Sequence, residues 1–363
     1  EMAQLVMERV CATTDQVTAI GKVIFGNCFA PLDQNVARVA AYRAGIPDSV
    51  PAFTINGTCG SSMQAIISAV QAVQCGEAQV VLAGGVESMS NAPYIMETAR
   101  WGQRIRHAQA YDLLWKGMQE YPIGVGMGLT AENLAEQYDI PRSEQDEFAV
   151  LSHQRAAKAI DEGRFKAETI PIPVPRPRKE PLIFDTDEHV RRDITLEQLG
   201  RLPAAFKKDG TVTAGNACGM NDAGAAILVT TFEKALEMGL QPLVRVRGYR
   251  VVGVDPNIMG IGPVPAIREA LARSGLGLGD IDRFEINEAF AAQYLACERE
   301  LGLDRNKVNP YGSGISLGHP VGATGCRLVV TLFHSMVSED LGLGVASLCA
   351  GGGMGFALVL ERI

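Results

Sequence analysis

Residues 53–62 read FTINGTCGSS and decide the class of fold. The first three are aromatic or β-branched and predict a buried strand, and a turn of small residues follows them. Apolar residues then recur every three or four positions, which predicts a helix with one buried face: Met63, Ile66, Ile67, Val70 and Val73. Residues 79–85, QVVLAGG, predict the next strand. This order of elements indicates a parallel sheet with helices on its faces.

The same alternation occurs on both sides of a long excursion. Residues 23–25 predict an earlier strand, and five more are predicted after residue 213, at residues 225–230, 243–251, 281–286, 344–349 and 354–360. The excursion, residues 90–213, contains both tryptophans, five prolines between positions 171 and 181, and a helical region at residues 131–163. We therefore predict two copies of one α/β plan with a separate lobe between them.

Composition limits the classes of function. The chain has 363 residues and a formal net charge of −8. This length suits two or three packed units, and the negative balance argues against nucleic acid or an anionic membrane as the main partner. No apolar run reaches the roughly 18 residues of a membrane span, and no signal peptide is visible. We expect a cytoplasmic protein, or one of an organelle matrix in a eukaryote. The start at Glu1 is interpreted as a cut end.

Eight cysteines show no CxxC spacing, so neither a disulfide scaffold nor a zinc cluster is expected. Cys59 lies between the predicted strand and helix, and its small neighbours would let a substrate carbonyl approach closely. The partial positive charge and free N–H groups of a helix N-terminus favour a thiolate. Cys59 is thus a candidate nucleophile, and the alternative is a buried structural cysteine.

Three further segments carry candidate chemistry. His319 lies in a glycine-rich loop before a predicted helix, with Pro320 expected in its first turn; it could accept a proton or bond its own backbone. Cys349 ends a strand before the glycines at residues 351–353, whose N–H groups could stabilise negative charge or form an ordinary hairpin. Asn287 follows a strand, at the side of an open α/β sheet where ligands bind.

Together these segments resemble the thiolase family over almost the whole chain. The matching stretches are residues 56–61 (NGTCGS), 84–90 (GGVESMS), 210–216 (GTVTAGN), 287–291 (NEAFA), 318–320 (GHP) and 349–353 (CAGGG). The resemblance implies a five-layered α-β-α-β-α fold made of two duplicated halves plus an inserted loop domain. It implies an N-terminal half at residues 1–88 and 219–241, a CoA-binding loop domain at residues 89–218, and a C-terminal half at residues 242–363. The family's first strand, expected at the centre of its sheet, is missing.

The resemblance also implies a role for each candidate. Cys59 would be the nucleophile that takes the acyl group, and His319 would activate it and then hydrogen-bond the thioester oxygen. Cys349 would be the acid and base at the α-carbon or the departing thiol. Asn287 would hold a water in one oxyanion hole, and the backbone N–H groups of Cys59 and Gly351 would form the other. A thiolate is both a good nucleophile and a good leaving group, and one shared acyl-enzyme predicts ping-pong kinetics.

The implied substrates are acyl-CoA esters, with CoA or acetyl-CoA as co-substrate, no permanently bound cofactor and no metal. Thiolases assemble as dimers or dimers of dimers, so a homodimer or homotetramer is expected. Family positions near the substrate match Arg191, Cys218, Met127, Met259 and Phe290. The alternative for Arg191 is a solvated surface arginine. The alternative for Met127 and Met259 is a plain core methionine. Cys218 replaces a CoA-contacting serine and is the weaker hydrogen-bonding partner.

The implied reaction is thiolytic cleavage of 3-ketoacyl-CoA or its reverse, the Claisen condensation of acetyl-CoA. Gly126, where acetoacetyl-CoA-forming members often carry histidine, and residues 202–210 favour the degradative members. A ketoacyl-synthase-type condensing enzyme is one alternative, although Cys349 before three glycines argues against it. A non-catalytic homologue that binds CoA esters or lipid is the other. The intact set of candidates argues against that homologue, and the missing first strand favours it.

Overall fold

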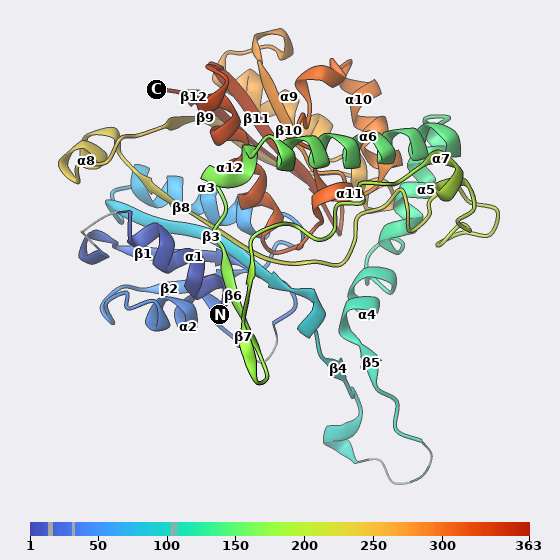
Figure 1. Ribbon diagram of the computed structural model, residues 1–363, viewed down its shortest axis with the longest axis horizontal. Helices are drawn as coiled ribbons and strands as arrows, with labels where there is room; N and C mark the ends of the chain where they lie inside the picture. The colour runs from blue at the N-terminus through green and yellow to red at the C-terminus, as the bar shows by residue number, and fades with distance from the viewer. Residues whose placement is uncertain (14–16, 31–32, 103–104, 106) are drawn as a thin grey trace.

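The computed structural model describes residues 1–13, 17–30, 33–102, 105 and 107–363. Two four-stranded sheets form its centre (Figure 1). In the first sheet the order is β2-β1-β3-β8; β1 runs parallel to β2 and β3, and β8 runs antiparallel to β3. Its strands are β1 (Lys22–Gly26), β2 (Ala52–Ile55), β3 (Val80–Ser88) and β8 (Asp222–Thr230).

The second sheet repeats this plan in the order β10-β11-β12-β9. Here β10 and β11 are parallel, and β12 is antiparallel to both β11 and β9. In each sheet a parallel pair is thus followed by an antiparallel strand, which confirms the predicted duplication. The strands are β9 (Val244–Gly253), β10 (Arg283–Ile286), β11 (Leu343–Ala350) and β12 (Met354–Arg362).

Helices complete five layers, because alternate side chains of the strands face opposite sides of each sheet. Helices α3 (Ser61–Gln74) and α12 (Thr324–Ser338) share one core with strands of both sheets and so form the middle layer. The outer face of the first sheet is covered by α1 (Met2–Cys11) and α2 (Val36–Arg43). The outer face of the second is covered by α9 (Pro263–Ser274) and α10 (Ala291–Leu301). This is the predicted α-β-α-β-α fold.

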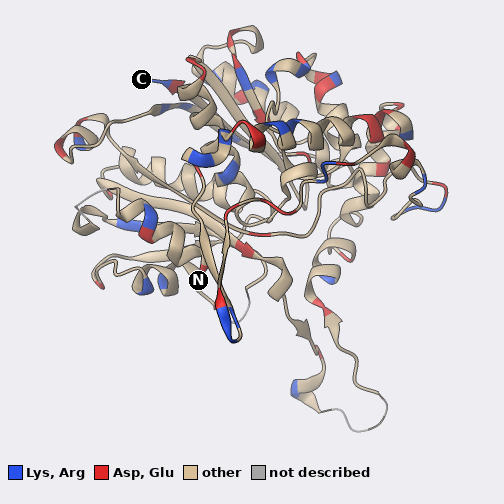
Figure 2. Cartoon of the chain, in the orientation of Figure 1, with Lys and Arg blue, Asp and Glu red and all other residues tan. Residues whose placement is uncertain are grey.

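The excursion supplies most of the remaining elements. An arm of β4, β5 and α4 extends away from the sheets, and α6 packs on α10 and on the short helix α11 (Gly314–Leu317) (Figure 1). Acidic and basic side chains are interspersed over the chain, with basic residues at the tip of the β6–β7 hairpin (Figure 2). The bounds are β4 (Tyr94–Ile95), β5 (Tyr111–Asp112), α4 (Leu113–Gln119), α5 (Met127–Gln137), α6 (Arg142–Asp161), β6 (Ile172–Arg176), β7 (Lys179–Phe184) and α7 (Leu196–Gly200).

Short helices connect these elements. Two are α8 (Phe232–Glu237) and α11 (Gly314–Leu317). The 3-10 turns are η1 (Val17–Ala19), η2 (Met89–Asn91), η3 (Ala99–Trp101), η4 (Arg164–Ala167), η5 (Pro256–Ile261), η6 (Leu278–Asp280) and η7 (Arg305–Lys307). Among the described residues, no helix is both long and apolar enough to cross a membrane.

Three sequence expectations are wrong. The strand at Phe53 is not buried: β2 is an edge strand, and Phe53 is 39% exposed. No gap interrupts the centre of the first sheet, since β1 pairs with β2 and β3, and β3 pairs with β8. In the second sheet, the strand that comes first in the sequence is β9, and it lies at the edge beside β12. By the duplicated plan, the family's first strand would lie at the edge of the first sheet beside β8, and not at its centre. Pro320 precedes α12, which begins at Thr324.

Candidate active site

Cys59 lies in a tightly held loop between β2 and α3. The preceding residue, Thr58, has a φ of 51°, a left-handed conformation that is rare for a β-branched side chain. Its carbonyl accepts hydrogen bonds from the Cys28 thiol at 3.1 Å and the Ser61 hydroxyl at 2.6 Å. Gly60 leaves no room for a side chain, because a Cβ there would lie 2.2 Å from the Phe356 ring. These contacts hold Cys59 at the N-terminus of α3, consistent with stored strain at a functional position.

Burial governs the protonation of Cys59. It raises the pKa of the thiol to about 11, and the backbone N–H groups of Gly351 and of Cys59 itself offset part of this rise. The N–H groups at the helix terminus favour the thiolate as expected, but desolvation of the charged form outweighs them, so the neutral thiol predominates in the free protein. The two donors are the same N–H groups that the family resemblance assigns to an oxyanion hole.

His319 is buried with a defined tautomer. Its Nδ1 lies 2.7 Å from the hydroxyl oxygen of Thr324, and that hydroxyl donates to the carbonyl of Pro320 at 2.9 Å. The Thr324 oxygen must then accept from Nδ1–H, which leaves Nε2 unprotonated. Nε2 has no hydrogen-bond partner among the described residues. Burial, and next the charge of Arg327, lower the pKa of His319 to about 3, so the ring is neutral at physiological pH.

Asn287 presents a buried amide with unused hydrogen-bonding capacity. Its side chain is 0% exposed, and neither amide atom has a partner among the described residues. Gly314 permits the close packing, since a Cβ there would lie 2.6 Å from Oδ1 of Asn287. The next residue, Glu288, is fixed by hydrogen bonds from Ser152 at 2.6 Å and Asn309 at 3.0 Å. An unpaired buried amide is costly, so this one fits a bound water or substrate oxygen.

Cys349 is the last residue but one of β11 and lies in an apolar cluster with Met259 and Phe290, against which Met127 packs. Burial raises the pKa of Cys349 well above its usual range, and the charge of Cys59 raises it further. Burial and then Cys59 likewise raise the pKa of Cys218 to about 12. The structure thus places Cys349 among the three predicted substrate-facing apolar residues.

Arg191 lies at a surface hollow that none of these thiols lines. It lines a shallow surface hollow of about 390 Å³ with Gln198, Leu199 and Leu202, and its backbone N–H donates to Nδ1 of His153 at 3.1 Å. No predicted catalytic residue lines this hollow.

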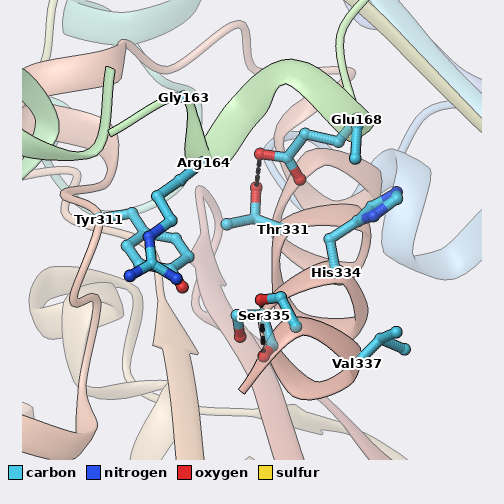
Figure 3. A pocket seen from close by; sticks show the side chains of 10 residues that line it. Gly163, Arg164, Glu168, Tyr311, Thr331, His334, Ser335 and Val337 are labelled. Atoms are coloured by element: carbon cyan, nitrogen blue, oxygen red, sulfur yellow. Dashed lines mark hydrogen bonds between the residues drawn. The ribbon is translucent and has the colours of Figure 1, made fainter. Parts of the chain in front are cut away.

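A second hollow, of about 310 Å³, lies between η4 and α12 (Figure 3). In it Glu168 accepts a hydrogen bond from Thr331 at 3.3 Å, and no predicted site residue lines it. Within the described ranges, no three His, Cys, Asp or Glu residues are grouped to hold a metal ion.

The structure adds residues that sequence reasoning missed. The buried carboxylate of Glu87 accepts the backbone N–H groups of Cys28 at 3.0 Å, Phe29 at 3.1 Å and Gly322 at 2.9 Å. It thereby ties the loop that carries His319 to the end of β1. Asn221 accepts the backbone N–H of His319 at 3.1 Å. Glu87 lies in residues 84–90, one of the stretches that resemble the thiolase family, and a charged residue in a predicted buried strand could have identified it as functional. No such sequence feature identifies Asn221.

Comparison with known proteins agrees with this geometry. The thiolase N-terminal domain matches residues 1–233, and the thiolase C-terminal domain matches residues 240–362. An acetyl-CoA acetyltransferase of Pseudomonas aeruginosa is 49% identical over 100% of this chain and 93% of its own length. The crystal structure of the Bacillus anthracis acetyl-CoA acetyltransferase superposes with a TM-score of 0.97 at 50% identity, covering 100% of this chain and 92% of that one.

A third relative was solved with a ligand. It is human mitochondrial 3-ketoacyl-CoA thiolase in complex with CoA, with a TM-score of 0.95 and 41% identity over 100% of this chain and 91% of that one. The chain described here belongs to the thiolase family. It is an acyltransferase with thiolase function. Neither a ketoacyl-synthase-type enzyme nor a non-catalytic binding protein is favoured by these relatives.

Proposed function

We propose that this thiolase cleaves 3-ketoacyl-CoA with CoA, or condenses acetyl-CoA in reverse, through an acyl group carried on Cys59. The observation that supports this most is the position of the Cys59 loop. The hydroxyl of Thr58, the residue before Cys59, lies 3.3 Å from the carbonyl oxygen of Gly351, so the Cys59 loop meets the glycine turn that follows Cys349, and the backbone N–H groups of Gly351 and Cys59 lower the pKa of the Cys59 thiol. This contact supports a site in which Cys59 is the nucleophile, the N–H groups of Cys59 and Gly351 are the oxyanion donors, and Cys349 is the second thiol. The CoA complex of the human relative supports CoA as the co-substrate.

In the first half-reaction, the Cys59 sulfur attacks the ketone carbon of the substrate. Nε2 of His319, which has no other partner, takes the thiol proton during the attack. The N–H groups of Cys59 and Gly351 stabilise the oxyanion that forms on this carbon. The bond between the ketone carbon and the α-carbon then breaks. The resulting acetyl-CoA enolate is stabilised by the water on Asn287 and by His319, and Cys349 donates a proton to its α-carbon.

In the second half-reaction, the thiol of an incoming CoA attacks the acyl group on Cys59, and the Cys349 thiolate takes the proton of that thiol. The same N–H pair stabilises the second tetrahedral oxyanion. The carbon–sulfur bond to Cys59 breaks, the acyl-CoA leaves, and the His319 imidazolium returns its proton to Cys59. The two thiols and the histidine are then as they began, and condensation is the same path reversed.

Finer assignments rest on the family resemblance. We propose that Arg191, Cys218, Met127, Met259 and Phe290 contact the acyl-CoA. The clustering of Met127, Met259 and Phe290 with Cys349 supports the acyl-pocket role, and the exposed hollow at Arg191 would suit a polar nucleotide end. The domain boundaries at residues 88, 218 and 241, a homo-oligomeric state, a degradative role in β-oxidation and a cytoplasmic location belong to the same proposal.

A thiolysis assay over a series of 3-ketoacyl-CoA chain lengths tests this function. We expect CoA-dependent cleavage by the wild type, its loss after iodoacetamide treatment, and protection from that loss by acetyl-CoA. Cys59→Ala should be inactive while it keeps the fold. Full activity in Cys59→Ala would contradict the proposal, and activity only on acyl groups bound to a carrier protein would revive the condensing-enzyme alternative.

A further inference from the structure

Tyr121 packs against the glycine turn that follows Cys349. It lies in the segment between α4 and α5, more than two hundred residues from that turn in the sequence. A Cβ placed on Gly351 would lie 3.5 Å from the Tyr121 ring, and one placed on Gly352 would lie 3.1 Å from its hydroxyl oxygen. Gly352 has a φ of 87°, so the turn is also fixed in a glycine conformation. The ring of Tyr121 therefore covers the outer side of the turn.

The segment that carries Tyr121 is held by close contacts at two glycines that follow Tyr121 in the sequence. Gly124 has a φ of 75°, and a Cβ there would lie 3.1 Å from the side chain of Pro256 in η5. Gly126 is packed so closely that a Cβ would lie 2.7 Å from the carbonyl of Gln119 at the end of α4. The ring position is thus set by backbone contacts with two elements, as a wall of a binding site requires.

Tyr121 and the loop that carries Cys59 both contact Gly351. The Thr58 hydroxyl, beside Cys59, lies 3.3 Å from the carbonyl oxygen of Gly351, and a Cβ on Gly351 would lie 3.5 Å from the Tyr121 ring and 3.2 Å from the Met127 sulfur. Burial raises the pKa of Tyr121, and the nearby thiols Cys59 and Cys28 raise it further, which agrees with this proximity. An acyl oxygen held by the Gly351 N–H would place the acyl carbon chain beside this turn.

We propose that Tyr121 is a specificity-determining residue that limits the length of the acyl chain carried on Cys59, with Met127 as the neighbouring part of the same wall. This inference rests on the proposed function, because it concerns the acyl group of that reaction. Removing the ring leaves space for further methylene groups beside the turn. Each added methylene contact in an apolar pocket changes discrimination by about 10-fold or more.

The test is the ratio of kcat/KM for 3-ketooctanoyl-CoA to that for acetoacetyl-CoA. Tyr121→Ala should raise this ratio at least about 10-fold. Tyr121→Phe should leave it within about 2-fold, because the ring is retained. Tyr121→Trp should lower the ratio, because the larger ring fills more of the space. This variant tests the inference in the opposite direction even if Tyr121→Ala does not fold. Ile123→Ala is the matched control, since this side chain lies in the same segment but is 55% exposed.

Two results would overturn the inference. One is an unchanged ratio in both folded Tyr121→Ala and folded Tyr121→Trp. The other is a shift in Tyr121→Phe or Ile123→Ala as large as that in Tyr121→Ala. If the wild type cleaves 3-ketoacyl-CoA and these results are found, only the role of Tyr121 fails. If the wild type neither cleaves 3-ketoacyl-CoA nor acylates Cys59, the proposed function fails and the role of Tyr121 fails with it.

Discussion

Nδ1 of His319 donates to the hydroxyl oxygen of Thr324, 2.7 Å away, and the Thr324 hydroxyl donates in turn to the carbonyl of Pro320. This chain fixes the imidazole tautomer and leaves Nε2 as the basic nitrogen. Thr324 does not meet the substrate in the proposed mechanism, so it is a positioning residue. Thr324 is the first residue of α12, so a helix of the middle layer positions the His319 ring directly.

Thr324→Val should therefore lower kcat by about 10- to 100-fold, because the ring loses its acceptor and its orientation. KM should change much less. Thr324→Ser keeps the hydroxyl and is the matched control, expected to retain most of kcat. Steady-state kinetics on both variants measure the effect, and a wild-type kcat in Thr324→Val would show that the hydrogen bond is not needed.

Cys349→Ala should separate the proton transfers of the reaction from the acylation of Cys59. In the proposed mechanism the Cys349 thiol moves protons at the α-carbon and at CoA, so thiolysis should fall by about 100- to 10,000-fold. Cys59 should still accept an acetyl group from acetyl-CoA, detectably by mass spectrometry although more slowly. A variant that cleaves 3-ketoacyl-CoA at the wild-type rate would exclude Cys349 as the acid.

The protonation of the free site gives a prediction about pH. The pKa of Cys59 is raised to about 11 and that of His319 is lowered to about 3. Since only the thiolate reacts, its fraction and the alkylation rate by iodoacetamide should rise about 10-fold per pH unit between about pH 6 and pH 9. A stopped assay of Cys59 labelling without substrate measures this rate. A plateau near neutral pH would instead indicate a preformed thiolate–imidazolium pair.

Glu87 should matter for stability. Its carboxylate accepts three backbone N–H groups and the Asn27 side chain at 3.0 Å. Glu87→Ala leaves these buried donors unpaired and should lower the free energy of unfolding by about 2–4 kcal/mol. Glu87→Gln keeps one acceptor oxygen and should lose less. Urea denaturation of the two variants and the wild type compares them, and equal midpoints would contradict this role.

Local patterns predicted most of the fold. The periodic apolar face of α3 and the β-branched run of β3 could be recognised because each is decided within one segment. The edge position of β2 could not be predicted, since it depends on which strands pair across the chain. The position beside β8 for an additional strand became clear only when the two sheets could be compared. Register and strand order are long-range properties, and one sequence does not specify them by pattern alone.

In the candidate site, too, the sequence predicts what is determined within one segment but not what depends on contacts between distant segments. Short runs of small residues singled out Cys59, His319 and Cys349, because close approach of a substrate to backbone N–H groups requires such neighbours. The sequence shows the helix terminus that favours a thiolate at Cys59, but it does not show the burial that raises the pKa of the thiol. Tyr121 was missed because no motif marks it, and its contact with Gly351 joins two distant segments.

Intact-protein and peptide mass spectrometry after incubation with acetyl-CoA tests the central claim most directly. We predict one added acetyl group on Cys59, removed on addition of CoA, and no such adduct in Cys59→Ala. An adduct that persists in Cys59→Ala, or folded wild-type protein that binds acetyl-CoA and never carries an acyl group on Cys59, would contradict the account.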